Sequence, residues 1–275
     1  MNSLLSSNPC AIIPTMYIGI DIGGTNIRIA NSETIDEPKL IHKLNFPNTQ
    51  DYAQNEQRVI TAIQQLAPSL DGIGISIMGR LDESKGIILS ASAAPQWVGK
   101  PFAATLRKAF SCQVALKGDQ YCAALSEATT LGSHDDFTCI VWGTGIGAAI
   151  VEYQNDKPLV RTIAYDKHVQ YLRPWQLDCG GKWVKENYGK PLEELSETEW
   201  AVVMNHFYDH LLTFIEELKQ SRLVFGGGVA LRQWPRFQVV FNRLRQEKTD
   251  LYDYVISLAY YGEDAELVGS LELLR

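Results

Sequence analysis

The sequence predicts an α/β protein made of two similar lobes. One pattern, an apolar strand, a turn of glycine and threonine and a second apolar strand, occurs at 17–30 (YIGIDIGGTNIRIA) and again at 137–153 (FTCIVWGTGIGAAIVEY). Two such hairpins in one chain indicate an internal duplication. Strand-like segments alternate with helical ones in both halves, and no stretch rich in Pro, Gly and Ser divides the chain. Two lobes joined by helical crossovers therefore fit better than separate domains on a linker.

The first half continues from the 17–30 hairpin through segments that the apolar spacing predicts. A helix is expected at 51–66 because Val59, Ile63 and Leu66 recur on one helical face. Strands are expected where short apolar runs lie between turn residues. In order, the predicted segments are a strand at 38–47, a helix at 51–66, a strand at 72–78, the start of a hairpin at 86–90, a helix at 101–110, a strand at 113–116 and a helix at 121–131.

The second half repeats this cycle after its own hairpin. Its clearest strand is the continuous apolar run Leu223-Val224-Phe225, which leads directly into three glycines. In order, the predicted segments are a helix-rich stretch at 196–219, a strand at 223–225, a helix beginning at 229–231, a strand at 254–258 and a terminal helix at 264–274.

The order of these segments suggests where one lobe ends and the other begins. We expect a polar leader at 1–16. The N-terminal lobe is predicted at 17–118, completed by the returning segment 259–275, and the C-terminal lobe at 119–258. The chain would thus cross between the lobes twice.

Composition and charge exclude several classes of protein. The formal net charge of -7 argues against nucleic-acid binding, because contacts to phosphates need clustered Lys and Arg. No apolar run reaches the roughly 18 residues that cross a bilayer, and the N-terminal stretch lacks the basic segment of a signal peptide. The five cysteines have no regular spacing and give no disulfide framework. We therefore expect a cytoplasmic protein with reduced thiols and with neither nucleic acid nor membrane as a partner.

The first hairpin carries the motif Asp21-Ile22-Gly23-Gly24-Thr25-Asn26. A glycine pair lets backbone N–H groups approach an anion at a distance that a Cβ would forbid. Thr25 and Asn26 add side-chain donors, and Asp21 at the end of its strand is a candidate to hold a hydrated magnesium ion. The alternative is an ordinary hairpin with a glycine turn.

Two further glycine motifs follow apolar strands in the second half. Gly143-Thr144-Gly145 repeats the logic of the first hairpin, and Gly226-Gly227-Gly228 would let a flat or anionic ligand approach the start of a helix. The alternative for each is a tight turn. Neither a GxGxxG fingerprint after the first strand nor a GK[ST] phosphate loop is present. Three such motifs at strand ends together favour a nucleotide site of another kind.

These motifs resemble the ROK family (repressors, open reading frames and sugar kinases) of the actin-like ATPase superfamily. IGIDIGGTNIRIA and WGTGIGAAIV are similar to its two phosphate motifs, and LVFGGGVA and GEDAELVGS to its adenosine motif and closing helix. The resemblance implies a two-lobed, ribonuclease H-like duplication with an interlobe cleft that binds ATP and Mg²⁺. GISIMGRLD is similar to a segment on the sugar side, with Met78 in place of a proline and Gly79 as a sugar contact.

The resemblance also places the general base at Asp119. The family carries an Asn-Asp pair in the loop after a short strand, and here the pair reads Gly118-Asp119. A carboxylate suits this position because phosphoryl transfer needs a sugar hydroxyl relieved of its proton and held in line with the γ-phosphate. The alternative for Asp119 is to cap the helix that follows. Gly118 is then expected to line the sugar pocket.

The sugar side departs from the family pattern. His168 occupies the position of a sugar-binding histidine, and Glu186 that of the final sugar-binding glutamate, but Tyr165 stands where a glutamate is expected. Of the family's zinc-binding cysteines, only Cys179 matches; Leu177 and Val184 replace the others. A tetrahedral zinc site needs about four N or S ligands, so we predict no structural zinc.

Taken together, the sequence predicts an ATP-dependent phosphotransferase acting on a hydroxyl of a hexose or an N-acetylhexosamine. An alternative is a sugar-sensing or regulatory protein with weak or no kinase activity. Only about sixteen residues precede the first strand, too few for a helix-turn-helix domain, and the nucleotide motifs are complete, so the sequence favours the enzyme. A third hypothesis is that the altered sugar pocket leaves only nucleotide binding or slow ATP hydrolysis. A homodimer is what the resemblance suggests.

Overall fold

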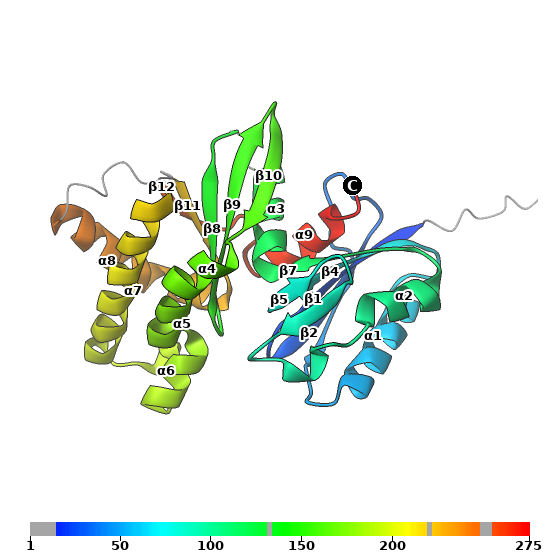
Figure 1. Cartoon of the computed structure of the whole chain (residues 1–275), viewed down its shortest axis with the longest axis horizontal. Helices are drawn as coiled ribbons and strands as arrows, with labels where there is room; N and C mark the ends of the chain where they lie inside the picture. Colours follow the sequence, from blue (N-terminus) through cyan, green and yellow to red (C-terminus); the bar gives the residue numbers. More distant parts are fainter. Residues whose placement is uncertain (1–14, 131–133, 219–221, 248–254) are drawn as a thin grey trace, which may run out of the picture.

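Two five-stranded sheets form the cores of two lobes that lie side by side (Figure 1). The computed structural model describes residues 15–130, 134–218, 222–247 and 255–275. The strand orders are β3-β2-β1-β4-β7 and β10-β9-β8-β11-β12. In each sheet the first three strands are antiparallel and the last three parallel, so the second sheet repeats the first. The α/β fold with two similar lobes is therefore confirmed.

The strands of the two sheets and of a small third one have the following bounds. The first sheet contains β1 (Met16–Ile22), β2 (Asn26–Ser32), β3 (Lys43–Pro47), β4 (Leu70–Ile77) and β7 (Gln113–Gly118). The second contains β8 (Phe137–Trp142), β9 (Ile146–Gln154), β10 (Lys157–Thr162), β11 (Arg222–Gly226) and β12 (Val255–Leu258). The two-stranded sheet pairs β5 (Arg80–Asp82) with β6 (Ile87–Ser90).

Helices cover the sheets and join the lobes. They are α1 (Tyr52–Leu66), α2 (Phe102–Phe110), α3 (Asp119–Thr130), α4 (Tyr165–Lys167), α5 (Arg173–Cys179), α6 (Gly181–Tyr188), α7 (Glu197–Leu218), α8 (Gly228–Glu247) and α9 (Ala265–Glu272). A single π-helical turn, His168–Leu172, connects α4 to α5. Within the described ranges, every helix is too short or too polar to cross a bilayer.

Local sequence explains where the first helix begins. The Asp51 carboxylate accepts hydrogen bonds from the backbone N–H groups of Ala53 and Gln54, at 2.9 and 3.2 Å, so Asp51 is the N-cap of α1. Val59 and Ile63 then face the sheet and are fully buried, as the predicted apolar face requires.

Glycines allow α9 to lie directly on the first sheet. A Cβ built on Gly74 of β4 would lie 1.7 Å from the carbonyl oxygen of Ser270. A Cβ on Gly269 of α9 would lie 1.8 Å from the carbonyl oxygen of Cys122 in α3. Figure 1 shows α3 and α9 between the two lobes. All eight residues of α9 are buried, so this helix is part of the core that joins the lobes.

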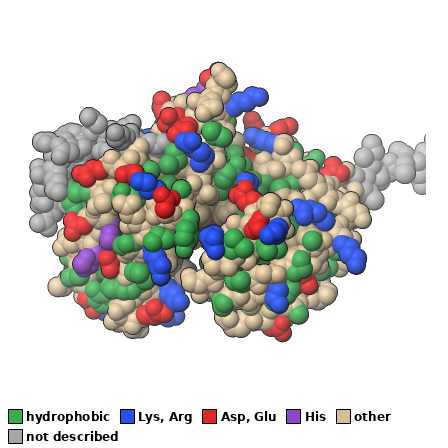
Figure 2. Space-filling view, in the orientation of Figure 1, with side chains coloured by type: hydrophobic (Ala, Val, Ile, Leu, Met, Phe, Trp, Pro, Cys, Tyr) green, Lys and Arg blue, Asp and Glu red, His purple; other side chains and the backbone are tan. Residues whose placement is uncertain are grey.

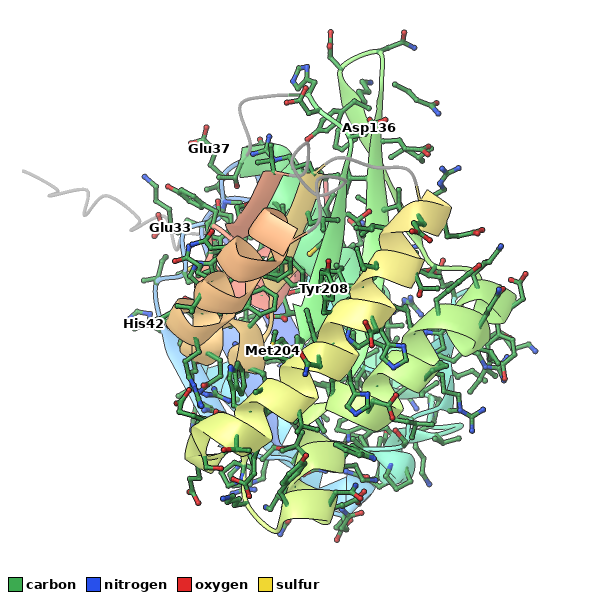
Figure 3. The ribbon with its side chains drawn as sticks, turned by 90° about the vertical axis from the view of Figure 1, so that its left-hand side faces the viewer. Glu33, Glu37, His42, Asp136, Met204 and Tyr208 are labelled. Carbon is green, nitrogen blue, oxygen red and sulfur yellow. The ribbon has the colours of Figure 1, made fainter. Side chains whose placement is uncertain are left out.

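An aromatic cluster fills the core of the second lobe. The Trp142 ring stacks on Phe207 with centroids 4.3 Å apart, and Trp175 packs edge-on against Phe207 at 4.8 Å. Figure 3 shows Met204 and Tyr208 on the side of α7 next to α8, and both side chains are buried in the same cluster. Aromatic packing therefore occupies the space between α5, α7 and the sheet.

Several boundaries and elements differ from the sequence expectation. The helix predicted at 121–131 begins two residues earlier, at Asp119, because β7 runs through Gly118 straight into α3. Strand β10 and helices α4 to α6 were not predicted, since Pro158 interrupts one segment and Pro174 the other. The leader up to Pro14 and the predicted ends at Leu131, Lys219 and Tyr254 lie outside the described residues.

Candidate active site between the lobes

The tip of the first hairpin is a tight turn whose backbone carbonyl groups accept hydrogen bonds from within the first lobe. The Gly23 N–H donates to the carbonyl of Asn26 at 3.0 Å and closes the turn. The Asn48 side chain donates to the carbonyl of Gly23 at 2.7 Å, and its backbone N–H donates to the carbonyl of Thr25 at 2.8 Å. Thr25 and Asn26 are exposed. The tip thus turns its carbonyls inward and leaves its polar side chains at the surface.

Asn48 is the centre of a buried amide network that sequence reasoning missed. Its side-chain oxygen accepts hydrogen bonds from Asn55 at 2.8 Å, from Gln96 at 2.9 Å and from the Trp97 indole N–H at 3.0 Å. This network connects α1 and the segment at 95–97 to the Gly23 turn.

We expect Asn48→Ala to destabilise the fold by about 2–4 kcal/mol, because the buried indole N–H and the Gly23 carbonyl lose their partner. Chemical denaturation measures the change, and Asn45→Ala at an exposed position of β3 is the matched control. A loss below about 0.5 kcal/mol, the usual size at surface positions, would contradict this role.

Asp21 lies at the end of β1 with both carboxylate oxygens engaged. Oδ2 accepts from Arg28 Nε at 3.0 Å and from a terminal Arg28 nitrogen at 2.7 Å, while Oδ1 accepts from the Ser76 hydroxyl at 3.0 Å. Arg28 also donates to Glu266 at 3.1 Å. Asp21 is 5% exposed. One lone pair of Oδ1 remains for a water, so the donor set fits a magnesium ion bound through water and not one bound directly beside Arg28.

The second hairpin carries Gly143, Thr144 and Gly145 between β8 and β9. The Gly143 N–H donates to the carbonyl of Gly145 at 2.9 Å. The carbonyls of Gly143 and Thr144 accept from the first two N–H groups of α6, Gly181 and Lys182, at 3.0 and 2.9 Å. Thr144 is exposed, and a Cβ on Gly143 would meet no atom within 4 Å. Open space over this turn is compatible with a bound anion.

The third glycine motif joins β11 to α8. Gly227 has φ +85°, and a Cβ there would lie 2.6 Å from the carbonyl oxygen of Trp142, so only glycine fits. Gly226 is the last residue of β11 and Gly228 the first of α8. The motif therefore lies next to the strand that leads into the Gly143 turn.

Asp119 is the first residue of α3, at the point where the chain leaves the first sheet. Its carboxylate accepts the N–H of the next residue, Gln120, at 2.9 Å. An N-cap usually accepts from an N–H two or three residues further along, so this bond within the first turn of α3 differs from the usual cap. Burial and the nearby Asp21 raise the pKa of Asp119 to about 7. Asp119 is thus a carboxyl group that titrates near neutral pH.

A third carboxyl group belongs to the same cluster. Burial and Asp21 raise the pKa of Glu266 to about 8, against the opposing effect of Arg28, and Asp119 contributes to the increase. Arg28 pairs with Asp21 and Glu266, while Asp119 interacts electrostatically with both of these carboxyl groups, at the junction of β1, α3 and α9. With pKa values of about 7 and 8, Asp119 is partly protonated and Glu266 mostly protonated at neutral pH.

Two of the predicted sugar-side residues, Gly79 and His168, lie near a contact between the lobes, and a third, Glu186, pairs within its own helix. Gly79 has φ +106° and precedes Arg80, whose guanidinium lies 5.2 Å from the ring centre of Tyr165 in the other lobe. His168 is half-buried one turn beyond Tyr165, and burial, aided by Arg173, lowers the pKa of its imidazole. Glu186 instead pairs with Lys182 at 3.8 Å on α6 and is 63% exposed. Sugar contacts at Gly79, Gly118, His168 and Glu186 stay predictions.

Cys179 is buried, and its thiol lies 3.5 Å from the carbonyl oxygen of Val203. Leu177 is exposed and Val184 buried where zinc ligands would be expected. Among the described residues, no group of three or more His, Cys, Asp or Glu could hold a metal. The absence of a structural zinc remains a prediction that elemental analysis of the purified protein tests.

The profile of the ROK family matches residues 17–159, more than half of the chain. The chain belongs to the ROK family. An N-acetyl-D-glucosamine kinase from Salmonella paratyphi C is 27% identical over 224 residues, which cover 72% of this chain and 68% of that protein. The matched range contains the first two glycine motifs, at 23–24 and 143–145.

Two solved structures have the same fold as this ROK protein. A putative N-acetylmannosamine kinase from Listeria monocytogenes has a TM-score of 0.73 at 20% identity, covering 94% of this chain and 99% of that one. A ROK family glucokinase from Streptomyces griseus, in complex with glucose and AMPPNP, has a TM-score of 0.71 at 19% identity, covering 94% and 98%. At these identities the likeness establishes the two-lobed fold.

Proposed function

We propose that this ROK protein is an ATP-dependent kinase that phosphorylates a hydroxyl of a hexose or an N-acetylhexosamine. The observation that carries the proposal is the position of Asp119. Its carboxyl group, with a pKa of about 7, lies near Asp21 at the end of β1, and the adjacent Gln120 lies close to Gly147, just beyond the second hairpin's turn. The surface is notched between the two lobes (Figure 2), and we propose that the acceptor binds between them.

In the proposed mechanism, backbone N–H groups of the two glycine hairpins bind the phosphates of ATP. Gly226, Gly227 and Gly228 would border the adenosine, as the resemblance to the family's adenosine motif implies; at Gly227 only glycine fits, because a Cβ would collide with the backbone of Trp142. The ionised Asp119 accepts the proton of the acceptor hydroxyl as that oxygen attacks the γ-phosphorus, and the bond between the γ-phosphorus and ADP breaks. Approach of the lobes would exclude water that could otherwise hydrolyse ATP.

Magnesium belongs to this proposal as the counter-ion of the phosphates. When bound, it would offset negative charge on the β- and γ-phosphates. Asp21 would hold it through water at Oδ1, while Arg28 keeps Oδ2 occupied. Arg28 therefore fixes the orientation of Asp21, with or without the ion.

A sugar panel tests the proposal. The purified protein is expected to consume ATP faster when a suitable hexose or N-acetylhexosamine is added with MgCl₂, and mass spectrometry is expected to detect the sugar phosphate. A broad panel that gives neither stimulation nor product would overturn the kinase proposal and favour a sugar-sensing role, which sugar-dependent changes in thermal stability would then reveal.

The pH dependence of this reaction follows from Asp119. Because burial and Asp21 raise its pKa to about 7, the carboxyl group is protonated below that pH and cannot accept a proton. We expect kcat/KM for the sugar to fall tenfold per pH unit below about pH 7 and to level off above it. A profile measured from pH 5.5 to 8.5 that stays flat would contradict Asp119 as the base.

We also propose a cytoplasmic location and leave homodimerisation as a prediction. Four of the five cysteines fall in the described part of the chain, and all four are free thiols, which suits a reducing compartment. Fractionation of the source cells and light scattering of the purified protein test the two points.

A further inference from the structure

Gln120 lies where the two lobes meet. A Cβ built on Gly118, at the end of β7, would lie 3.4 Å from the side-chain oxygen of Gln120 and 3.5 Å from its nitrogen. A Cβ built on Gly147 of β9, in the other lobe, would lie 3.6 Å from Gln120 Cβ and 3.8 Å from the same oxygen. Gln120 thus lies close to two glycines, one from each sheet, with room for about a methyl group on each of them.

The backbone and the side chain of Gln120 have different roles. Its backbone N–H donates to the Asp119 carboxylate at 2.9 Å and so orients the proposed base. Its side chain is half-buried, and within the described ranges the carboxamide has no hydrogen-bond partner. A carboxamide offers two donors and two acceptor lone pairs, and this one lies close to Gly118 and Gly147. Its hydrogen-bonding capacity is therefore available for a ligand beside Asp119.

We propose that Gln120 is the residue that holds and selects the acceptor sugar beside Asp119. A sugar hydroxyl both donates and accepts, as a carboxamide does, so Gln120 would bind the hydroxyl next to the one that Asp119 deprotonates. The neutral amide favours an uncharged polyol over a sugar acid, because a carboxylate there would approach Asp119, Asp21 and Glu266. This inference rests on the proposed kinase activity and adds a positioning residue to it.

The closeness of Gly118 and Gly147 to Gln120 predicts what an added side chain would do. A side chain on residue 118 would enter the volume that the Gln120 carboxamide occupies, since the built Cβ is already in contact with it. Gly118→Asn alone should therefore crowd the site. When Gln120 is also replaced by Ala, the asparagine carboxamide can take the vacated space. The two substitutions should compensate each other, which independent structural defects would not do.

The test is steady-state kinetics of the full chain with the best acceptor from the sugar panel. We expect Gln120→Ala to raise KM for the sugar by 10- to 100-fold and to leave KM for ATP within twofold. Gly118→Asn should lower kcat/KM for the sugar at least tenfold, and the double variant should recover at least threefold of that loss. Gln113→Ala, an exposed glutamine at the other end of β7, is the matched control and should change neither KM.

The possible outcomes distinguish the proposed role of Gln120 from the proposed kinase activity on which it rests. A wild-type protein with sugar-stimulated ATP consumption but an unchanged sugar KM in Gln120→Ala would overturn the role of Gln120 and leave the kinase in place. No stimulation in the wild type would overturn the kinase itself. Circular dichroism confirms folding of every variant; if Gln120→Ala fails to fold, Gln120→Asn, which shortens the side chain by one methylene, carries the same comparison.

Discussion

Asp119→Asn is expected to abolish the sugar-dependent part of ATP consumption, with a loss of at least about 100-fold in kcat. The amide has nearly the shape of the carboxyl group but cannot accept the proton of the acceptor hydroxyl. Sugar and nucleotide should still bind, because the hairpins and Gln120 are untouched. Calorimetry with the sugar and an ATP analogue measures binding, and coupled-assay kinetics measures turnover.

The same substitution should stabilise the fold at pH 8. The pKa of Asp119 rises from 3.8 to about 7 on folding, so the folded state binds the proton more tightly, and stability from this group falls as the pH rises from about 4 to 7. Three pKa units correspond to about 4 kcal/mol; partial exposure of the carboxylate reduces the expected gain to about 2 kcal/mol. Asp209→Asn on the exposed face of α7 is the control. If Asp119→Asn keeps near wild-type turnover, Asp119 is not the general base.

Gly74→Ala should be the most damaging single-methyl addition in the first sheet. The new Cβ would lie 1.7 Å from the carbonyl oxygen of Ser270, a backbone atom of the fully buried helix α9. Relief requires a shift of the helix, because no side chain can rotate away. We expect a loss of about 3 kcal/mol or more in unfolding free energy, or failure to fold.

Gly72→Ala gives the comparison on the same strand. Its Cβ would lie 3.1 Å from a methyl group of Leu274, the end of a flexible side chain, so the expected loss is below about 1 kcal/mol. Thermal unfolding of both variants measures the difference. Equal effects would mean that the close contact of α9 with β4 does not limit stability.

The sequence predicts those elements of the fold that are determined by residues close together along the chain. The two hairpins, the buried strands and helix α1 follow from apolar spacing and glycine turns, and the structure contains them. Asp119 was also placed at the right junction, between a strand and a helix, although the helix begins two residues earlier than expected. Local pattern is sufficient there because each element carries its own signal within about ten residues.

Contacts between distant segments had no such signal. Arg28 and Glu266 are 238 residues apart, and Asn48 and Trp97 are 49 apart, yet both pairs are tied together at the candidate site. The sequence alone assigns no role to Asn48, which lies between a predicted strand and a predicted helix. Gln120 could not be assigned either, because its closeness to Gly147 depends on how one sheet meets the other.

The crossing of α3 and α9 limits how the lobes can move. There is less room than a methyl group needs between Gly269 and the backbone of Cys122, so we expect these helices to stay in contact when the lobes move. Their crossing would then be the axis of an opening motion. Asp119 lies one turn of helix from Cys122, near the axis, so it would travel little while the outer tips of the molecule swing apart to admit a substrate.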